Sequence, residues 1–516
     1  APIAEYLHLD AAAGTAPAVS LMHVANAPGE RVVLGAMPSL RGDTDDVRCY
    51  ADAAGRALAR GRAAGMRRPI VFVESPLPPT SGATARMNAA AKARLERDYV
   101  RYVEVALLGM LQEAYTPLQA REWLTAQQKA DLCQPFKEIG VAMPSGAPEA
   151  AFASTLRFVD AVERGRALAR DVGGSDPERM SPQRCATHIR EALAQVADCP
   201  VSYEALTDQA TLEQEYPLLT AVTRASDSVP RHAPVVVTMR YASPDPSAVK
   251  ENLFLVGKGV TYDTGGLDVK TGGAMRGMSR DKLGAAAVAG LMLTTALLRP
   301  TRVNIVAHCC FVRNSCGANG YVDDEVLVSR AGVRVLVGCT DAEGRMIMAD
   351  ALHHAKQEAL ALPATAAPAK LFTVATLTGH VIRAYGPYMG LVPNGVARED
   401  GTAARLDAAA HVWGDPAERS SLRREDYALI AAPADRTADV LQANTQPSTL
   451  TPRGHQYPAA FLAVASGLDR HGLDSAQPLA YVHMDIAGSA ECSHPGGTTG
   501  LPRTTGSPIA ALVGTF

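Results

Sequence analysis

Four charged residues stand among glycines and apolar residues in the middle of the chain. Lys258, Asp263, Lys270 and Asp281 follow one another at offsets of 5, 7 and 11 residues, and the segments between them are mostly glycine, small or apolar. A protein normally spreads its charges over a solvated face, whereas these four are surrounded by residues that pack closely or bend sharply. The setting indicates a polar cluster beside a core.

A second segment, Thr340-Asp341-Ala-Glu343-Gly-Arg345, has the same character. Four carboxylates gathered without cations would repel one another in a low-dielectric site, and their pKa values would rise until some took up protons. Divalent ions remove that repulsion, and carboxylates that bridge two ions about 3.5–4 Å apart suit a site that activates a water. We therefore predict that the two segments close one metal site, in which oxygen-rich ligation suits Zn, Mn, Mg or Co.

Each of these residues has an ordinary explanation when it is taken alone. An Asp beside a glycine usually forms a turn, and a lone Lys is usually a solvated surface charge. Asp281 could stabilise the positive end of a following helix, and Glu343 with Arg345 could be a pair in a first helical turn. The joint spacing and the apolar setting favour the metal site over these explanations.

Other catalytic motifs are absent or incomplete. The segment 257–262 lacks the third glycine of a dinucleotide-binding loop, and neither HExxH nor a G-x-S-x-G nucleophile elbow occurs. His353 and His354 are adjacent on an expected helix, so they lie on different faces and cannot chelate one ion together. Cys309 and Cys310 stand in an apolar strand and are expected in the core.

Composition bounds the class of protein. With 516 residues, 47% of them hydrophobic, the chain is too long for one core, and two domains are expected. A net charge of -3 argues against nucleic-acid and membrane-surface partners. Nine cysteines without a CxxC pair favour a reducing compartment. We expect a cytoplasmic protein, with an organelle such as the mitochondrion left open.

Membrane and export signals are also not expected. The longest apolar run, Ala285 to Leu298, is shorter than a membrane span and contains two threonines, so it fits a buried helix. No Lys or Arg precedes Arg31, which argues against a signal peptide. The first residue is Ala1 rather than Met, so a removed presequence stays open.

The first part of the chain predicts a small α/β domain. The expected strands are 31–35 and 69–74, and the expected helices are 45–65 and 88–115. A break rich in Pro and Gly follows at 142–148, and an amphipathic helix then ends at Gly173-Gly174. We predict three parts: an N-terminal α/β domain over 1–153, a connecting helix over 154–174 and a catalytic domain over 175–516.

The catalytic domain is expected to be α/β, with a mostly parallel central sheet flanked by helices. The expected strands are 235–239, 252–256, 303–307, 371–375 and 481–486, with helices at 283–298 and 346–361. Sites in such sheets form at the carboxyl ends of strands. Lys258 and Asp263 are expected to follow one strand and 376–380 another, while 340–345 follows an expected hairpin at 325–337.

At these positions the sequence resembles the leucyl aminopeptidases, the two-metal cytosol aminopeptidases. The family signature is Asn-Thr-Asp-Ala-Glu-Gly-Arg-Leu, and this chain has Cys339-Thr-Asp-Ala-Glu-Gly-Arg-Met346. The other matching segments are 256–266, Lys270, Asp281, 375–379 and 483–488. The resemblance is strong from about 250 to 380 and thin before about 165. It implies an enzyme that releases leucine and similar apolar residues from the amino termini of short peptides, and a homo-hexamer.

The resemblance also implies a role for each ligand. Asp263 and Glu343 would bridge two divalent ions, Asp341 would complete the tighter-held ion, and Lys258 and Asp281 would complete the exchangeable one. Lys258 would then bind as a neutral amine, which requires the metal to lower its pKa far below that of a free lysine. A water that bridges the ions would attack the first peptide carbonyl, and the substrate's amino group would bind the exchangeable ion.

Two further residues would act in catalysis. By the resemblance, Lys270 would polarise the carbonyl and stabilise the oxyanion, and Arg345 would hold a bicarbonate ion that moves the proton from water to the leaving amine. Small and apolar side chains in the implied substrate pocket suit Leu or Met. The pocket residues are Met278, Thr376, Leu377, Gly379, Ala487 and Ala490.

The sequence departs from the family in three places. Cys339 replaces Asn, Asp323-Asp324-Glu325 replaces a Pro-Gly-Asp-like turn, and 444–455 is more polar than usual, so a loop near the site is expected to differ in shape.

Two other functions stay open: a hexameric DNA-binding or regulatory scaffold, and a dimetal hydrolase of another class. The charge balance argues against the first, and Lys270 with Arg345 favours peptide hydrolysis over the second.

Overall fold

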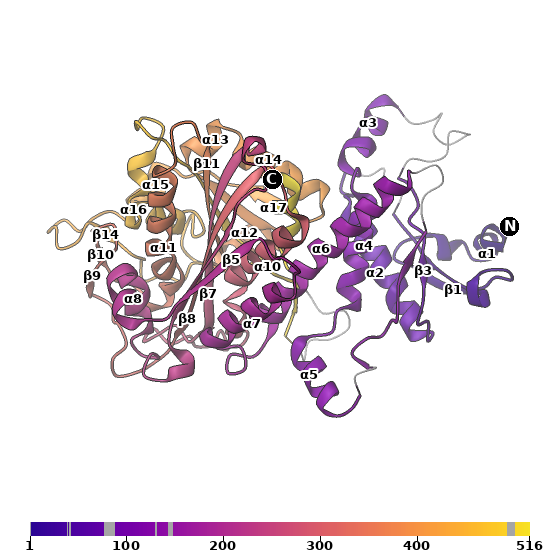
Figure 1. Ribbon diagram of the computed structural model, residues 1–516, viewed down its shortest axis with the longest axis horizontal. Coiled ribbons are helices and arrows are strands. Elements are labelled where there is room, and N and C mark those ends of the chain that lie inside the picture. The colour runs from indigo at the N-terminus through magenta and orange to yellow at the C-terminus, as the bar shows by residue number, and fades with distance from the viewer. Residues whose placement is uncertain are drawn as a thin grey trace. The chain divides into compact units, whose positions relative to one another are not determined.

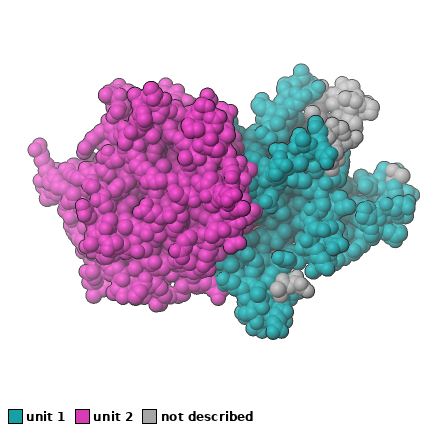
Figure 2. All heavy atoms as spheres, in the orientation of Figure 1, with its two compact units in different colours: residues 1–163, 408–415 teal, residues 164–407, 416–516 magenta. Residues whose placement is uncertain are grey.

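The computed structural model describes residues 2–38, 40, 43–76, 88–129, 132–142, 148–492 and 501–516. The chain forms two compact units: unit 1 contains residues 1–163 and 408–415, and unit 2 contains residues 164–407 and 416–516 (Figure 2). The division between 163 and 164 falls inside helix α6, Glu149–Gly174. Most of the break expected at 142–148 lies outside the described residues.

Unit 1 combines helices with two small sheets. Strand β1 (Val19–His23) pairs antiparallel with β2 (Arg31–Gly35), and β3 (Ile70–Val71) pairs parallel with β4 (Gly140–Val141). The strand expected at 69–74 is therefore paired over only two residues. Besides the first part of α6, unit 1 contains the helices α1 (Pro2–Leu9), α2 (Arg48–Ala63), α3 (Ala89–Asp98), α4 (Tyr102–Ala114) and α5 (Leu118–Ala126).

The single helix expected over 88–115 is wrong, because the structure has α3 and α4 with a bend between them. Tyr99 lies at this bend with non-helical backbone angles and is completely buried. It packs in a core cluster with Val47, Tyr50 and Leu95. Burial of this large aromatic side chain outweighs the local helical preference of the segment.

Unit 2 is built on an eight-stranded sheet in the order β13-β12-β15-β11-β7-β8-β6-β5. The strands are β5 (Val201–Leu206), β6 (Val235–Tyr241), β7 (Glu251–Asp263), β8 (Val303–Asn314), β11 (Ala369–Ala375), β12 (Met389–Pro393), β13 (Ala417–Arg419) and β15 (Ala480–Asp485). The central strands β15, β11, β7 and β8 are parallel, and antiparallel pairs lie toward the edges. The predicted mostly parallel sheet is confirmed.

Helices cover both faces of this sheet (Figure 1). Helix α10 (Leu283–Leu298) lies directly on one face of β7, since a Cβ at Gly257 would stand 2.5 Å from the Ala285 Cα. Helix α11 (Glu343–Leu360) lies on the other face, where Lys258 meets Gly344. Gly257 and Lys258 are successive strand residues and therefore point to opposite faces of the sheet. Their contacts with α10 and α11 place β7 between the two helices.

The stretch Met278–Leu298 is apolar and long enough to cross a membrane by length and composition. Nearly all of it is buried inside unit 2, which is typical of the core helix of a globular domain. This agrees with the buried helix expected for the apolar run that ends at Leu298.

The remaining helices surround the sheet and connect its strands. They are α7 (Pro182–Ala194), α8 (Gln209–Glu215), α9 (Pro217–Thr223), α12 (Gly379–Tyr385), α13 (Gly395–Glu399), α14 (Thr402–Val412), α15 (Arg424–Ala428), α16 (Tyr457–Ala465) and α17 (Ile509–Thr515). Helix α14 runs across the division between the two units at residues 407 and 408.

Two small sheets complete unit 2. Strands β9 (Val326–Val328) and β10 (Arg334–Leu336) form the hairpin that was expected at 325–337, and β14 (Val440–Leu441) pairs parallel with β10. The other small sheet joins β16 (Glu491–Cys492) and β17 (Arg503–Thr504). Because β10 leads directly to residues 338–345, the hairpin positions the second charged segment.

Strand β7 is longer than the sequence predicts. The expectation that Lys258 and Asp263 follow the strand is wrong, because both residues lie within it. Gly257 and Gly259 suggest a strand end, yet they pair with Cys309 and Phe311 of β8. Tertiary pairing and the close approach of α10 therefore override the weak strand propensity of glycine.

Candidate metal centre

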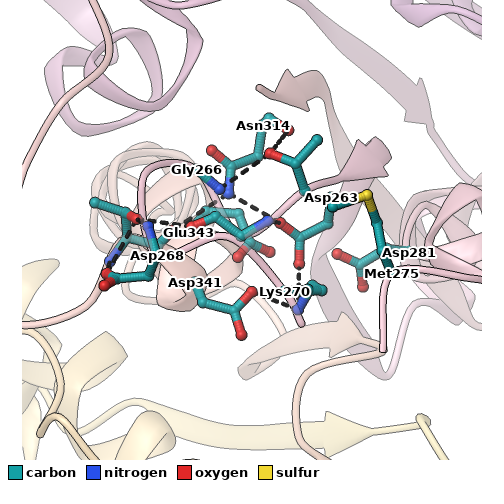
Figure 3. Close-up of polar contacts among 12 residues, drawn as sticks. Asp263, Gly266, Asp268, Lys270, Met275, Asp281, Asn314, Asp341 and Glu343 are labelled. Carbon is teal, nitrogen blue, oxygen red and sulfur yellow. Dashed lines mark hydrogen bonds and ion pairs between the residues drawn. The ribbon is translucent and has the colours of Figure 1, made fainter. Parts of the chain in front are cut away.

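The two charged segments meet at the carboxyl-terminal half of β7. Asp263 ends that strand, Asp281 follows the short helix η7 (Met278–Arg280), Asp341 lies in the turn η8 (Thr340–Ala342), and Glu343 begins α11. One carboxylate oxygen from each of Asp263, Asp341 and Glu343 lies within 4.8 Å of the others (Figure 3). Lys258 and Lys270 form ion pairs with these residues and with Asp281, so the four carboxylates and two lysines lie together.

Lys258 joins the two segments inside the protein. Its Nζ lies 2.8 Å from Asp281 Oδ2 and 2.9 Å from Glu343 Oε1, and it donates a hydrogen bond of 3.1 Å to the Thr376 carbonyl. Only 4% of the lysine side chain is exposed. The amine therefore lies between a carboxylate of the first segment, Asp281, and a carboxylate of the second, Glu343.

Gly344 gives Lys258 its space. A Cβ at position 344 would lie 2.5 Å from Lys258 Cε and 2.7 Å from both Cδ and Nζ. Real Cβ atoms do not approach other heavy atoms so closely, so the end of the Lys258 side chain would have to shift. A side chain at 344 would therefore displace the lysine from its two carboxylates.

Lys270 makes a second bridge between the segments. Its Nζ lies 2.9 Å from Asp263 Oδ2 and forms a short ion pair with Asp341 Oδ1, as Figure 3 shows. Unlike Lys258, it comes from the loop after β7. The loop turns at Gly265 and Gly266, which both have positive φ angles that favour glycine.

Burial and mutual repulsion oppose ionisation of the carboxyl groups. Burial raises the pKa of Asp281 well above its ordinary value, and Lys258 only partly opposes this. Burial also raises the pKa of Asp341, with Asp263 and Glu343 adding to the effect. For the lysines, burial lowers the pKa, but the surrounding carboxylates outweigh it and raise the pKa of both Lys258 and Lys270.

The donor set fits divalent cations. Among the described residues, Glu343 Oε2 is buried without a hydrogen-bond or ion-pair partner, whereas Asp281 Oδ2, Asp341 Oδ1 and Glu343 Oε1 face the two lysines. Four carboxylates also carry two more negative charges than the two ammonium groups neutralise. Buried negative charge in excess of the nearby ammonium groups is costly unless a further cation faces it, so this set of donors fits a divalent metal ion.

Two residues that the sequence analysis did not select hold the segments together. Asn314, at the carboxyl end of β8, donates to Asp263 Oδ1 at 2.9 Å and to the Thr340 carbonyl at 3.2 Å. Thr340 Oγ1 donates to the Gly265 carbonyl at 2.7 Å. No signal in the sequence marked Asn314, because the expected strand ends at 307 whereas β8 continues to Asn314.

Arg345 lies in the first turn of α11 and is almost completely buried. Its Nη1 donates to the Gln442 carbonyl at 2.9 Å, and its Cζ lies 4.7 Å from the centre of the Tyr457 ring. Its Nε is buried without a hydrogen-bond partner. The guanidinium therefore keeps donor capacity for an anion, although its described contacts are with Gln442 and Tyr457 rather than with the four carboxylates.

Of the six predicted pocket residues, Thr376 contacts the charged cluster directly. Its Oγ1 donates to Asp281 Oδ1 at 2.8 Å. The backbone N–H groups of Leu377 and Ala487 both donate to Asp485 Oδ1 at 3.2 Å, which brings the ends of β11 and β15 together. Gly379 begins α12 and donates to Ser448 Oγ at 3.1 Å.

The last two predicted pocket residues lie on other segments. Met278 is half-buried at the start of η7, and Ala490 is buried beyond β15. No described contact joins them to Thr376, so their place in a substrate pocket stays a prediction.

Comparison with known proteins agrees with this geometry. Residues 167–513 match the model of the cytosol aminopeptidase family, catalytic domain. A Caenorhabditis elegans protein named as an aminopeptidase is 37% identical over 486 residues, which cover 94% of this chain and 85% of that protein. A Chlamydia abortus protein named as a cytosol aminopeptidase is 31% identical over 337 residues, covering 65% of this chain and 60% of that protein.

Two solved structures share the fold. The bottromycin maturation enzyme BotP in complex with Mn superposes with a TM-score of 0.74 at 22% identity, covering 99% of this chain and 95% of its own. A tomato leucine aminopeptidase mutant gives a TM-score of 0.73 at 19% identity, covering 99% and 86%. The family match covers the whole of the charged cluster. The chain therefore belongs to the cytosol aminopeptidase family and is a metal-dependent aminopeptidase, a hydrolase.

Proposed function

We propose that the chain binds two divalent ions and releases leucine and similar apolar residues from the amino termini of short peptides. The convergence of four carboxylates from two distant segments, more than the two lysines beside them can neutralise, carries this proposal. Zn or Mn are the proposed ions, with Mg or Co as alternatives. The ligands would be Lys258, Asp263, Asp281, Asp341 and Glu343.

The bound ions would supply an activated water and a binding site for the free amino group of the substrate. Lys258 would contribute a neutral amine, so its ammonium proton must leave when the metal enters. The carboxylates now raise the pKa of Lys258, and a metal on the same carboxylates would reverse that influence. Metal binding should accordingly release protons and weaken as the pH falls.

Lys270 would keep its proton and stabilise the oxyanion. The pKa of both lysines is raised, so the proposed difference is supported by position. Lys270 lies in the loop after β7, whereas Lys258 lies inside the strand, with its Nζ between Asp281 and Glu343. A positive group fixed before the reaction lowers the barrier without reorganisation. In this role its Nζ would turn toward the substrate carbonyl when the substrate and the metal ions bind, before the reaction begins.

Arg345 would bind bicarbonate, which would accept the proton from water and pass it to the leaving amine. The buried guanidinium with an unpaired Nε supports an anion at this position. Stacking on Tyr457 and the bond to Gln442 fix the guanidinium plane. We further propose a substrate pocket around Thr376, a homo-hexamer and a cytoplasmic location, in line with relatives named as cytosol aminopeptidases.

A chelation experiment tests the proposed function. Protein stripped with a chelator should lose hydrolysis of leucine amide, and Mn²⁺ or Zn²⁺ should restore it. Elemental analysis of the restored enzyme should find two ions per chain. Hydrolysis that is indifferent to the chelator would contradict the metal site, and faster hydrolysis of an amide of a charged amino acid than of leucine amide would contradict the proposed preference.

A further inference from the structure

Gln442 is a fully buried residue that follows strand β14 and contacts the second charged segment. It lies 97 to 106 residues from its partners Leu336 to Arg345 along the chain, so the tertiary fold alone brings it there. It belongs to neither the proposed metal ligands nor the proposed catalytic residues. Its contacts nevertheless surround two of them, Asp341 and Arg345.

The side-chain amide of Gln442 makes four hydrogen bonds to one loop. Its Oε1 accepts from the backbone N–H groups of Gly338 and Cys339, both at 3.1 Å. Its Nε2 donates to the Cys339 carbonyl at 2.9 Å and to the Ala342 carbonyl at 3.0 Å. An amide has two donor hydrogens and two acceptor lone pairs, so these contacts use all of its hydrogen-bonding capacity.

The backbone of Gln442 adds two further bonds. Its N–H donates to the Leu336 carbonyl at 2.8 Å, directly after the paired residues of β10 and β14. Its carbonyl accepts from Arg345 Nη1 at 2.9 Å. Gln442 thus continues the strand pairing beyond the point where the loop 338–342 leaves β10, and reaches the first turn of α11 at the same time.

These contacts bracket Asp341. The bonded atoms of Cys339 lie two residues before it, and the bonded carbonyl of Ala342 lies one residue after it. Without the amide, the N–H groups of Gly338 and Cys339 would lose the acceptor Oε1, and the carbonyls of Cys339 and Ala342 would lose a donor, so the loop would be free to move. Asp341 would move with them, and a small displacement of a ligand is costly at a metal site.

We propose that Gln442 is a positioning residue that sets the loop carrying Asp341 and the guanidinium of Arg345 in one geometry. This inference rests on the proposed function, because it assumes that Asp341 binds a metal ion and that Arg345 acts in the reaction. It predicts that changes at Gln442 weaken metal binding and lower kcat, with a smaller effect on KM.

The test uses Gln442→Glu in the full chain. The carboxylate keeps the acceptor for Gly338 and Cys339 but cannot donate to the carbonyls of Cys339 and Ala342. Titration of chelator-stripped protein with Mn²⁺, followed by calorimetry, should show about 10–100-fold weaker binding of at least one ion, the range found when groups that orient metal ligands are changed. After saturation with Mn²⁺, kcat for leucine amide should fall at least tenfold and KM should change less than threefold.

Asn252→Asp is the matched control. Asn252 is also a buried amide, and it lies at the end of β7 away from the charged cluster. Its Nδ2 donates to the Ala367 carbonyl at 2.7 Å. The same amide-to-acid change there should lower the melting temperature and leave Mn²⁺ affinity and kcat within twofold of the wild type. The control separates a general loss of stability from a loss of positioning.

Three outcomes decide the inference. Gln442→Glu with wild-type Mn²⁺ affinity and kcat would overturn it, even if the melting temperature falls. If that variant does not fold, Gln442→Met, which preserves the size of the side chain, is measured in the same way and judged by the same values. If the wild type neither binds Mn²⁺ nor hydrolyses leucine amide, the proposed function itself fails. That failure is distinguishable from a failure of the inference about Gln442, because it is seen in the wild type without any substitution.

Discussion

Strands β7 and β8 carry opposite kinds of polar chemistry at their two ends. At the amino-terminal end, Asn304 Nδ2 donates to Asn252 Oδ1 at 2.9 Å, and Asn304 Oδ1 accepts from the Ser243 N–H at 2.9 Å. These groups are neutral and satisfy one another. At the carboxyl-terminal end, buried carboxylates outnumber the lysines beside them.

The difference separates structural from functional polarity. Neutral amides that satisfy each other stabilise the fold without any ligand. Buried charges in excess do the reverse, since their desolvation is repaid only when a cation binds. Substitutions at the two ends should therefore affect different measurements: ligand binding and turnover at the charged end, and unfolding free energy at the neutral end.

The largest effect is expected for Asp281→Asn. The amide is neutral and a weaker metal ligand, so one ion should bind more weakly than the other and kcat/KM for leucine amide should fall at least about 100-fold. Metal content after dialysis and steady-state kinetics measure both. Retention of two ions with unchanged affinities would contradict the assignment of Asp281 as a ligand.

Lys270→Ala should lower kcat by about 10²–10³-fold, the range found when one group that stabilises an oxyanion is removed. Both ions should remain, because Lys270 is proposed to contact substrate rather than metal. Lys258→Met provides the contrast, since it should remove metal as well. Equal loss of metal in the two variants would show that the lysines do not differ in role.

At the neutral end, Asn304→Leu should lower the free energy of unfolding by about 1–3 kcal/mol, because it leaves the Ser243 N–H and an Asn252 oxygen without partners. Denaturant unfolding measures this loss. Mn²⁺ affinity and kcat should match the wild type. A tenfold change in either one would mean that the two ends of the strands are not independent.

The smallest effect concerns His308, which lies between the two ends of β8. Burial lowers its pKa to about 4. An unfolded histidine takes up a proton near pH 6.5, so below that pH the unfolded state binds more protons than the folded state. The unfolding free energy therefore falls as the pH falls, by at most about 1.4 kcal/mol per pH unit, until the folded residue also takes up a proton. His308→Gln should show a shallower loss between pH 7 and 5. Parallel curves for the two proteins would contradict this.

Much of the charged cluster could be predicted because its residues are unusual for their surroundings. Asp341 and Glu343 were paired correctly with a segment some sixty residues earlier, since charges among glycines and apolar residues point to a buried site. The extent of β7 could not be predicted, because Gly257 and Gly259 favour a strand end locally. Their place in the strand depends on β8 and α10, which no local pattern includes.

Amide side chains in supporting positions were harder to predict. Asn314 and Gln442 have no distinctive neighbours in the sequence, and each acts through carbonyl and N–H groups that only the folded chain brings near. In the structure, the backbone of Cys339 is held by Gln442 on both its N–H and its carbonyl.

The contact between Gly344 and Lys258 also limits how this sequence can evolve. The two positions lie 86 residues apart, yet any side chain at 344 would occupy the space of the lysine terminus. An alanine at 344 would push the lysine terminus away from Asp281 and Glu343, and a shorter residue at 258 would make room for it at the cost of an amine ligand. The two positions should therefore covary among related chains, and a relative with a larger residue at 344 should have replaced the lysine and changed its metal chemistry.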